Sequence, residues 1–415
     1  MQTEGGNTVS TNIVEQPAEH GVSPNSDAGF TIDETLAQAV QSGNIPGVVA
    51  MAATRDNVVY EGAYGQSGEE QSVQVSADSM FWIASMSKPI TSIAAMQLLE
   101  QNKLQLDRPI GELLPELANP QVLEGFATDG RPLMRPAKGP ITLRQLLTHT
   151  SGFGYAFGEA QLLKYVQKEA IPDVTTCTPN AFRLPLMFDP GERWHYGISL
   201  DWVGKVIEAA SGQRLEEYFQ QHIFGPLGMV DTTFAPTSER RERLMPMHAR
   251  LPDGSLQPIP FELPEDPEFY LAGGGLFGTA RDYLKLLQMI LNEGTFNGLQ
   301  ILRPETVRLM AQNHIGDLQA GKMTSAMPEL TQDVEFFPGM EKRWGLGYLI
   351  NTEATPEGRS AGSLGWAGLA NTYFWVDPAR QVTGVIMTQI LPFADPAMME
   401  VFNQFEAGVY RQLDA

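Results

Sequence analysis

Strand-like segments lie at both ends of this chain, and helical segments fill the part between them. The strand-like stretches are residues 45–55, 57–65, 344–350, 371–378 and 381–390, which alternate or run apolar. Strands so far apart in the chain bury their apolar faces together when they share a sheet. The pattern therefore predicts one antiparallel sheet assembled from both chain ends.

Helical periodicity marks the middle of the chain and its last segment. The helical stretches are residues 86–102, 142–150, 199–212, 214–228, 280–294, 303–313 and 398–413. Order begins at Thr31, where a capping box with Glu34 precedes a helix, because both side chains can satisfy free backbone N–H groups there. Residues 1–30 are polar and lack an apolar core, so they read as a disordered N-terminal arm.

These elements predict an α/β fold of the α+β type. An antiparallel sheet built from both chain ends is flanked by helices and carries an all-helical inserted domain. We expect the sheet domain to comprise residues 31–84 and 270–415, and the helical domain residues 85–269. The active site is expected between the two.

Composition excludes several functional classes. A formal net charge of −21 argues against nucleic acid as a partner, because phosphate backbones are bound by clustered Lys and Arg. The one cysteine, Cys177, allows no internal disulfide, and metal-ligand spacings are missing from the sequence. The sequence contains no apolar run of membrane-spanning length and no visible signal peptide, so we expect a cytoplasmic protein, with a processed exported form left open. The oligomeric state is not readable.

The strongest candidate for chemistry is the pair Ser85 and Lys88 in FWIASMSKPITSIAA. Residues three apart share a helix face, so hydroxyl and amine point into the same space. The apolar helix around Lys88 predicts that it is buried, and burial near a helix N-terminus favours the neutral amine. A neutral Lys88 can accept the proton of Ser85, as an activated nucleophile requires.

Two further segments complete a candidate site. Tyr196 follows a Pro-Gly turn and precedes a helix, and a phenol beside an ammonium is expected to have a lowered pKa and to relay protons. The segment from Gly365 to Gly368 is glycine-flanked, which lets a strand backbone approach a ligand closely. The N–H of Leu369, paired with that of Ser85, would then form an oxyanion hole.

A glycine-rich segment offers a competing interpretation. Gly273, Gly275 and Gly278 precede a helix in the G-x-G-x-x-G spacing of dinucleotide-binding proteins. Regular alternation of strands and helices does not surround it, so we expect a turn packed against the active site and no organic cofactor.

Taken together, these motifs resemble the serine β-lactamase-like superfamily. Ser85-x-x-Lys88, a tyrosine motif about a hundred residues later and a glycine-flanked strand near the C-terminus follow the order of that superfamily. The stretch from Trp194 to Lys205 is especially similar to family VIII carboxylesterases and statin-type side-chain acyltransferases. The resemblance implies Ser85 as acylated nucleophile, Lys88 and Tyr196 as its proton relay, and no metal.

The chain departs from the lactamase pattern at two places. The Y-x-N motif becomes Tyr196-Gly197-Ile198, which removes the amide that holds a β-lactam side chain. The K-T-G motif becomes Trp366-Ala367-Gly368, which removes the cation that pairs with a penicillin carboxylate. Ile198 and residues 366–368 are therefore predicted to bind substrate and to favour neutral, apolar acyl groups.

The sequence thus predicts a carboxylesterase that cleaves short-to-medium acyl esters through an acyl-Ser85 intermediate. Three alternatives remain open at this point: an acyltransferase that passes the acyl group to an alcohol, a β-lactamase or D-alanyl-D-alanine carboxypeptidase, and a non-catalytic binding module. The natural ester is not readable from the sequence.

Overall fold

A computed structural model describes residues 31–67 and 73–415 of the chain. The expected N-terminal arm, residues 1–30, lies outside the described residues. Within the described ranges, no helix is both long and apolar enough to cross a membrane.

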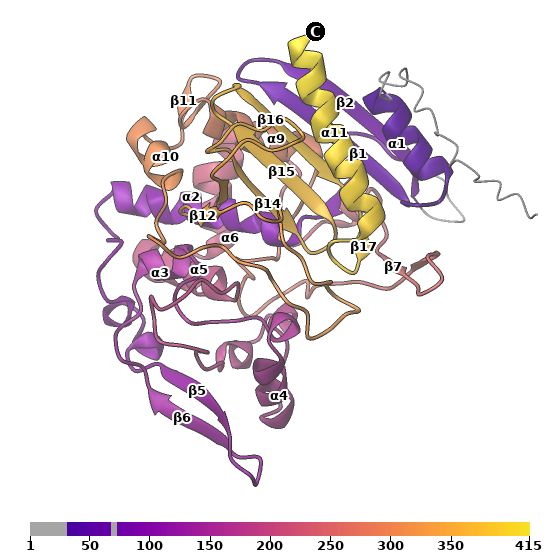
Figure 1. Cartoon of the computed structure of the whole chain (residues 1–415). Coiled ribbons are helices and arrows are strands. Elements are labelled where there is room, and N and C mark those ends of the chain that lie inside the picture. Colours follow the sequence, from indigo (N-terminus) through magenta and orange to yellow (C-terminus); the bar gives the residue numbers. More distant parts are fainter. Residues whose placement is uncertain (1–30, 68–72) are drawn as a thin grey trace, which may run out of the picture.

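An eight-stranded sheet joins the two ends of the chain, as the sequence predicts (Figure 1). Its strands, in spatial order, are β12 (Lys342–Trp344), β13 (Leu349–Asn351), β14 (Leu364–Gly368), β15 (Thr372–Asp377), β16 (Val382–Met387), β1 (Gly47–Thr54), β2 (Val58–Ser67) and β3 (Val73–Gln74). The N-terminal strand β1 pairs antiparallel with the C-terminal strand β16, with Ala50 opposite Ile386. The antiparallel sheet from both termini is therefore confirmed.

Strand β1 shows how the sheet divides the core into two layers. Val49, Met51 and Ala53 face one hydrophobic cluster, and the alternate residues face another. The strand is apolar on both faces because both are covered. Helices α1 (Ile32–Gln41) and α11 (Pro396–Asp414) pack on one face, and α9 (Ala280–Leu291) packs on the other (Figure 1). The expected capping box of Thr31 and Glu34 begins α1.

The segment between the two halves of the sheet is mainly helical. Its helices are α2 (Ser87–Glu100), α3 (Leu143–Leu147), α4 (Ala160–Lys168), α5 (Ser199–Ser211), α6 (Leu215–Phe219), α7 (Gly225–Leu227) and α8 (Ser238–Arg241), with a π-helical turn at Gln220–Phe224. It also contains strands β4 (Phe81–Trp82), β5 (Gln121–Phe126), β6 (Pro132–Pro136), β7 (His248–Arg250) and β8 (Leu256–Pro258). The expectation of an all-helical insertion is therefore corrected: β5 and β6 form a hairpin that projects away from the sheet (Figure 1). The proposed domain boundaries stay a prediction.

The remaining elements are short strands outside the eight-stranded sheet and a further helix. They are β9 (Phe277–Gly278), β10 (Thr295–Phe296), β11 (Leu299–Gln300), α10 (Pro304–Met310) and β17 (Ile390–Leu391). The stretch 344–350 was expected to be one strand but is divided between β12 and β13. The bend follows from Gly347, whose φ is +112°; a Cβ there would lie 2.5 Å from the Ser92 hydroxyl of α2.

Candidate active site

Ser85 lies in a sharp turn between a short strand and a helix. Strand β4 pairs with β9, and the chain then enters a 3-10 turn at Ala84–Met86 before α2 begins at Ser87. Ala84 has φ of 44°, in the left-handed region that residues with a Cβ rarely adopt. Such backbone strain persists where surrounding contacts hold it, and here it presents the Ser85 side chain to a cavity.

Lys88 lies one helical turn beyond Ser85 and is fully buried. Its Nζ is 2.9 Å from Ser85 Oγ, 2.6 Å from the Gly273 carbonyl oxygen and 3.2 Å from the Tyr155 hydroxyl. Burial lowers the pKa of Lys88, and the negative charge of Asp201 opposes that shift. The expected contact between nucleophile and amine is therefore present, with the amine shifted toward its neutral form.

The glycine-rich segment packs against this lysine. The Gly273 N–H donates to Asp201 Oδ1 at 2.7 Å, while its carbonyl accepts from Lys88. A Cβ at Gly273 would lie 2.8 Å from Asp201 Oδ2, so a larger residue would displace the carboxylate. The glycine spacing thus serves a close approach of backbone to the Lys88 site.

Tyr196 reaches the same site from the loop that precedes α5. Lys88 Nζ lies 4.8 Å from the centre of its ring, and Trp366 Nε1 donates to its hydroxyl at 3.2 Å. Burial raises the pKa of Tyr196 above its ordinary value, while contacts with Ser85 and Trp366 act in the opposite direction. The expectation of a lowered pKa is therefore wrong, because the phenolate loses more from desolvation than it gains from its neighbours.

The two residues after Tyr196 are both tightly enclosed. A Cβ at Gly197 would lie 2.3 Å from the Phe153 carbonyl oxygen, so only glycine fits. Ile198, predicted to bind substrate, is fully buried in the hydrophobic core at the start of α5. The structure does not place it on the cavity wall.

Strand β14 brings the C-terminal segment against the nucleophile turn. A Cβ at Gly368 would lie 2.3 Å from the Ile83 carbonyl oxygen, two residues before Ser85. Leu369 follows directly beyond the strand, and it lines the same cavity as Ser85. Ser85 and Leu369, whose N–H groups are predicted to form an oxyanion hole, thus line the same cavity.

The cavity at Ser85 has a volume of about 420 Å³. Its walls come from segments far apart in the chain and are mostly apolar; they include Trp82, Phe157, Phe261, Met327, Trp366 and Phe393. Ala367, Gly368 and Leu369 also line it, as predicted for the Trp366 segment. Lys322 lies on the wall, is 56% exposed and is paired with Asp333 at 3.7 Å.

Two residues of the site were missed by the sequence interpretation. Tyr155 is buried and hydrogen-bonded to Lys88, and Asp201 is 1% exposed behind it. One signal for Asp201 was available, since an acidic residue stands between the large apolar residues Leu200 and Trp202 in the first turn of α5. Tyr155 lies in an aromatic loop with no periodicity that would single it out.

Comparisons with known proteins agree with this geometry. The beta-lactamase family model matches residues 32–408. The chain is 33% identical to lovastatin esterase of Penicillium rubens, over 92% of this chain and 99% of that protein. It is 31% identical to monacolin J acid methylbutanoyltransferase of Aspergillus terreus, over 93% of this chain and 97% of that protein.

A solved structure shows the same architecture. Unliganded simvastatin synthase from Aspergillus terreus superimposes with a TM-score of 0.80 at 30% identity, and the match covers 92% of this chain and 97% of that one. The resemblance proposed from the sequence motifs is confirmed, and so is the β-lactamase-like fold. The chain belongs to the beta-lactamase family, within the serine β-lactamase-like superfamily of enzymes.

Proposed function

We propose that this protein is a serine carboxylesterase that works through a covalent acyl-Ser85 intermediate. Ser85 Oγ attacks the ester carbonyl carbon while its proton passes to Lys88 Nζ. The proton then moves through Tyr196 to the departing alkoxide, and water repeats the cycle to release the acid. The backbone N–H groups of Ser85 and Leu369 stabilise the charge on the carbonyl oxygen.

The contact between Ser85 Oγ and Lys88 Nζ carries this proposal. At 2.9 Å it is a hydrogen bond, and Lys88 is fully buried while Ser85 opens onto the cavity. A lysine that only solubilised the surface would not be buried beside a hydroxyl. The name of the esterase relative from Penicillium rubens supports the same reaction class.

The apolar wall supports neutral esters over β-lactam antibiotics as substrates. Trp366 stands where the lactamase pattern has a cation, and its indole N–H is already engaged by Tyr196. Lys322, the cation on the wall, is largely exposed and paired with Asp333, so it offers little to a buried carboxylate. Short-to-medium acyl groups fit a cavity of about 420 Å³.

Acyl transfer to an alcohol is a second candidate function. The methylbutanoyltransferase relative favours it, and the cavity has room for an alcohol beside the acyl group. Both reactions share the acyl-Ser85 intermediate and differ in whether water or a bound alcohol accepts the acyl group.

A substrate panel tests these alternatives directly. We expect efficient cleavage of p-nitrophenyl acetate and butyrate and marginal turnover of a chromogenic cephalosporin. An unpaired lactam carboxylate in this partly dry site should cost roughly a thousandfold in rate. Trp366→Lys should move the ratio toward the cephalosporin. Equal efficiency of the wild type on the butyrate ester and the cephalosporin would contradict the proposal, and a faster release of p-nitrophenol on adding an alcohol would favour transfer.

A further inference from the structure

A buried carboxylate stands behind Lys88, joined to it through two intervening residues. Asp201 Oδ1 accepts from the Gly273 N–H at 2.7 Å, and the Gly273 carbonyl accepts from Lys88 Nζ at 2.6 Å. Asp201 Oδ2 accepts from the Tyr155 hydroxyl at 3.4 Å, and that hydroxyl oxygen accepts from Lys88 at 3.2 Å. The two routes close a ring of hydrogen bonds around the amine.

For both Lys88 and Asp201, the charge of the partner shifts the pKa in the direction opposite to the shift caused by burial. Burial lowers the pKa of Lys88, whereas Asp201 raises it. Burial also raises the pKa of Asp201, whereas Lys88 lowers it. Groups that interact this strongly titrate as a pair, so removing one charge changes the protonation of the other.

The buried tyrosines, histidine and cysteine around the pair are held in their neutral forms at neutral pH. Burial raises the pKa values of Tyr155 and Tyr196 and lowers that of His149, whose ring packs on Tyr196. Burial also raises the pKa of Cys177 to about 11, with a smaller contribution from the charge of Asp201. Asp173, which lies on the cavity wall, adds to the increase in the pKa of Tyr155 through its charge. Among these groups of the described chain, Asp201 is the buried one that supplies negative charge to Lys88.

We propose that Asp201 is a positioning residue for the acyl-transfer reaction. Its carboxylate keeps Lys88 basic enough to take the Ser85 proton, and it holds the Lys88 amine in place through Tyr155 and Gly273. The inference rests on the proposed function. A general base works best when its proton affinity suits the operating pH, and burial without a counter-charge would make this amine too weak a base. The proton itself moves from Ser85 Oγ to Lys88 Nζ, and Asp201 takes part through charge and orientation.

The test is the pH dependence of kcat/KM for p-nitrophenyl butyrate in Asp201→Asn. The amide can still accept the Gly273 N–H, so the substitution removes charge with little change of shape. Activity rises with pH as Lys88 loses its proton. With the carboxylate gone the pKa of Lys88 falls, so the acidic limb should move to lower pH by about one unit or more, and the maximum rate should fall. The pH dependence of Ser85 labelling by a fluorophosphonate should shift in the same direction.

Two further variants separate this role from a purely structural one. Tyr155→Phe removes one link of the ring and should shift the limb in the same direction by less, and it carries the test should Asp201→Asn fail to fold. Asp282→Asn is the matched control, because Asp282 is also buried in the first turn of a helix and accepts backbone N–H groups of Asp231 and Thr232. It should lower stability and leave the limb unmoved.

The outcomes distinguish this inference from the proposed function. The role of Asp201 would be overturned if the wild type is active and the acidic limb of its kcat/KM profile does not move to lower pH in either Asp201→Asn or Tyr155→Phe. The esterase proposal would then still stand. A wild type that neither cleaves esters nor labels at Ser85 would overturn both.

Discussion

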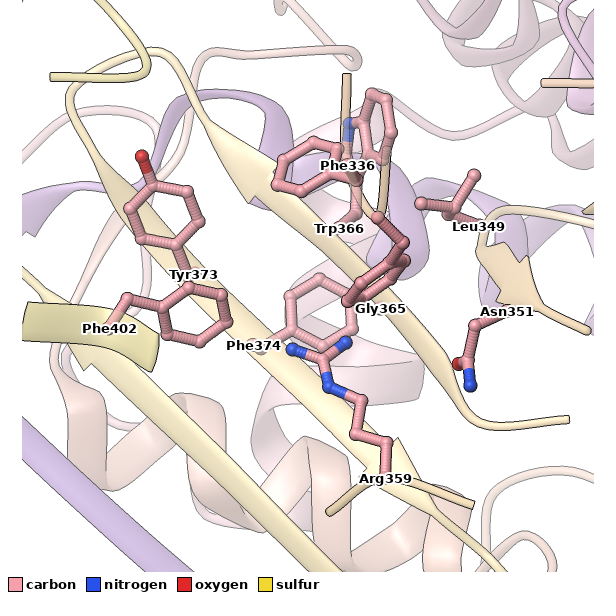
Figure 2. Close-up of a pocket in the computed structure, with 10 residues that line it drawn as sticks. Phe336, Leu349, Asn351, Arg359, Gly365, Trp366, Tyr373, Phe374 and Phe402 are labelled. Atoms are coloured by element: carbon pink, nitrogen blue, oxygen red, sulfur yellow. The ribbon is translucent and has the colours of Figure 1, made fainter. Parts of the chain in front are cut away.

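Two buried sites in this protein combine a cation and a carboxylate, but they connect these groups differently. On the α11 side of the sheet, Arg359 meets Glu406 through two direct hydrogen bonds of 2.6 and 2.5 Å. The guanidinium lies 5.5 Å from the Phe402 ring centre, and Figure 2 shows both side chains among the residues that line one pocket. The two charges of this cluster, Arg359 and Glu406, are in direct contact.

The cluster at Lys88 avoids such a direct pair. Its carboxylate, Asp201, reaches the amine through Tyr155 and Gly273, and the amine contacts the neutral hydroxyl of Ser85. A bidentate guanidinium–carboxylate pair holds both charges permanently, because arginine does not lose its proton in proteins. A lysine linked through neutral groups can gain and lose a proton. The comparison indicates that the first cluster supports the fold and the second supports chemistry.

The sharpest way to separate the two clusters is to remove the nucleophile. Ser85→Ala should abolish ester turnover, a loss on the order of 10⁶, because the acyl-enzyme can no longer form. Far-UV circular dichroism and the melting temperature should stay close to those of the wild type, since the hydroxyl opens onto a cavity. Substantial residual turnover would contradict the assignment of Ser85 as the nucleophile.

The next largest effect concerns the proton relay. Lys88→Ala and Tyr196→Phe should each lower kcat by about 10² to 10⁴, and the double mutant should be little worse than either, because both residues handle the same proton. A double-mutant cycle on kcat with p-nitrophenyl butyrate measures the coupling. Fully multiplicative losses would place the two residues in separate steps.

The smallest effect on turnover is expected at the Arg359–Glu406 pair, where a substitution should change stability alone. Glu406→Gln leaves the Arg359 charge without its counter-charge in a buried site, which should cost about 3 to 5 kcal/mol in the free energy of unfolding. Urea denaturation measures the loss, and Glu400→Gln, an exposed position on the same helix, is the control. The acidic limb of kcat/KM should not move. A shifted limb would show that the two clusters are coupled and that the comparison fails.

The sequence by itself determined the sheet assembled from both termini, the helices between them and the pairing of Ser85 with Lys88. Local periodicity marks the strands and helices, and a separation of three residues brings Ser85 and Lys88 together across the turn that leads into α2. The motif order also led to the superfamily that the comparisons confirm.

Only the tertiary structure decided the surroundings of the amine. Tyr155 and Asp201 lie 67 and 113 residues from Lys88 in the chain, so no local pattern connects them. Burial raises the pKa of Tyr196, where the sequence predicts a lowered pKa. Ile198 is buried in the core, where the sequence predicts a substrate contact. Both outcomes depend on how α5 and β14 pack. Solvent exclusion and long-range contact are properties of the folded chain, and they set the chemistry that the motif makes possible.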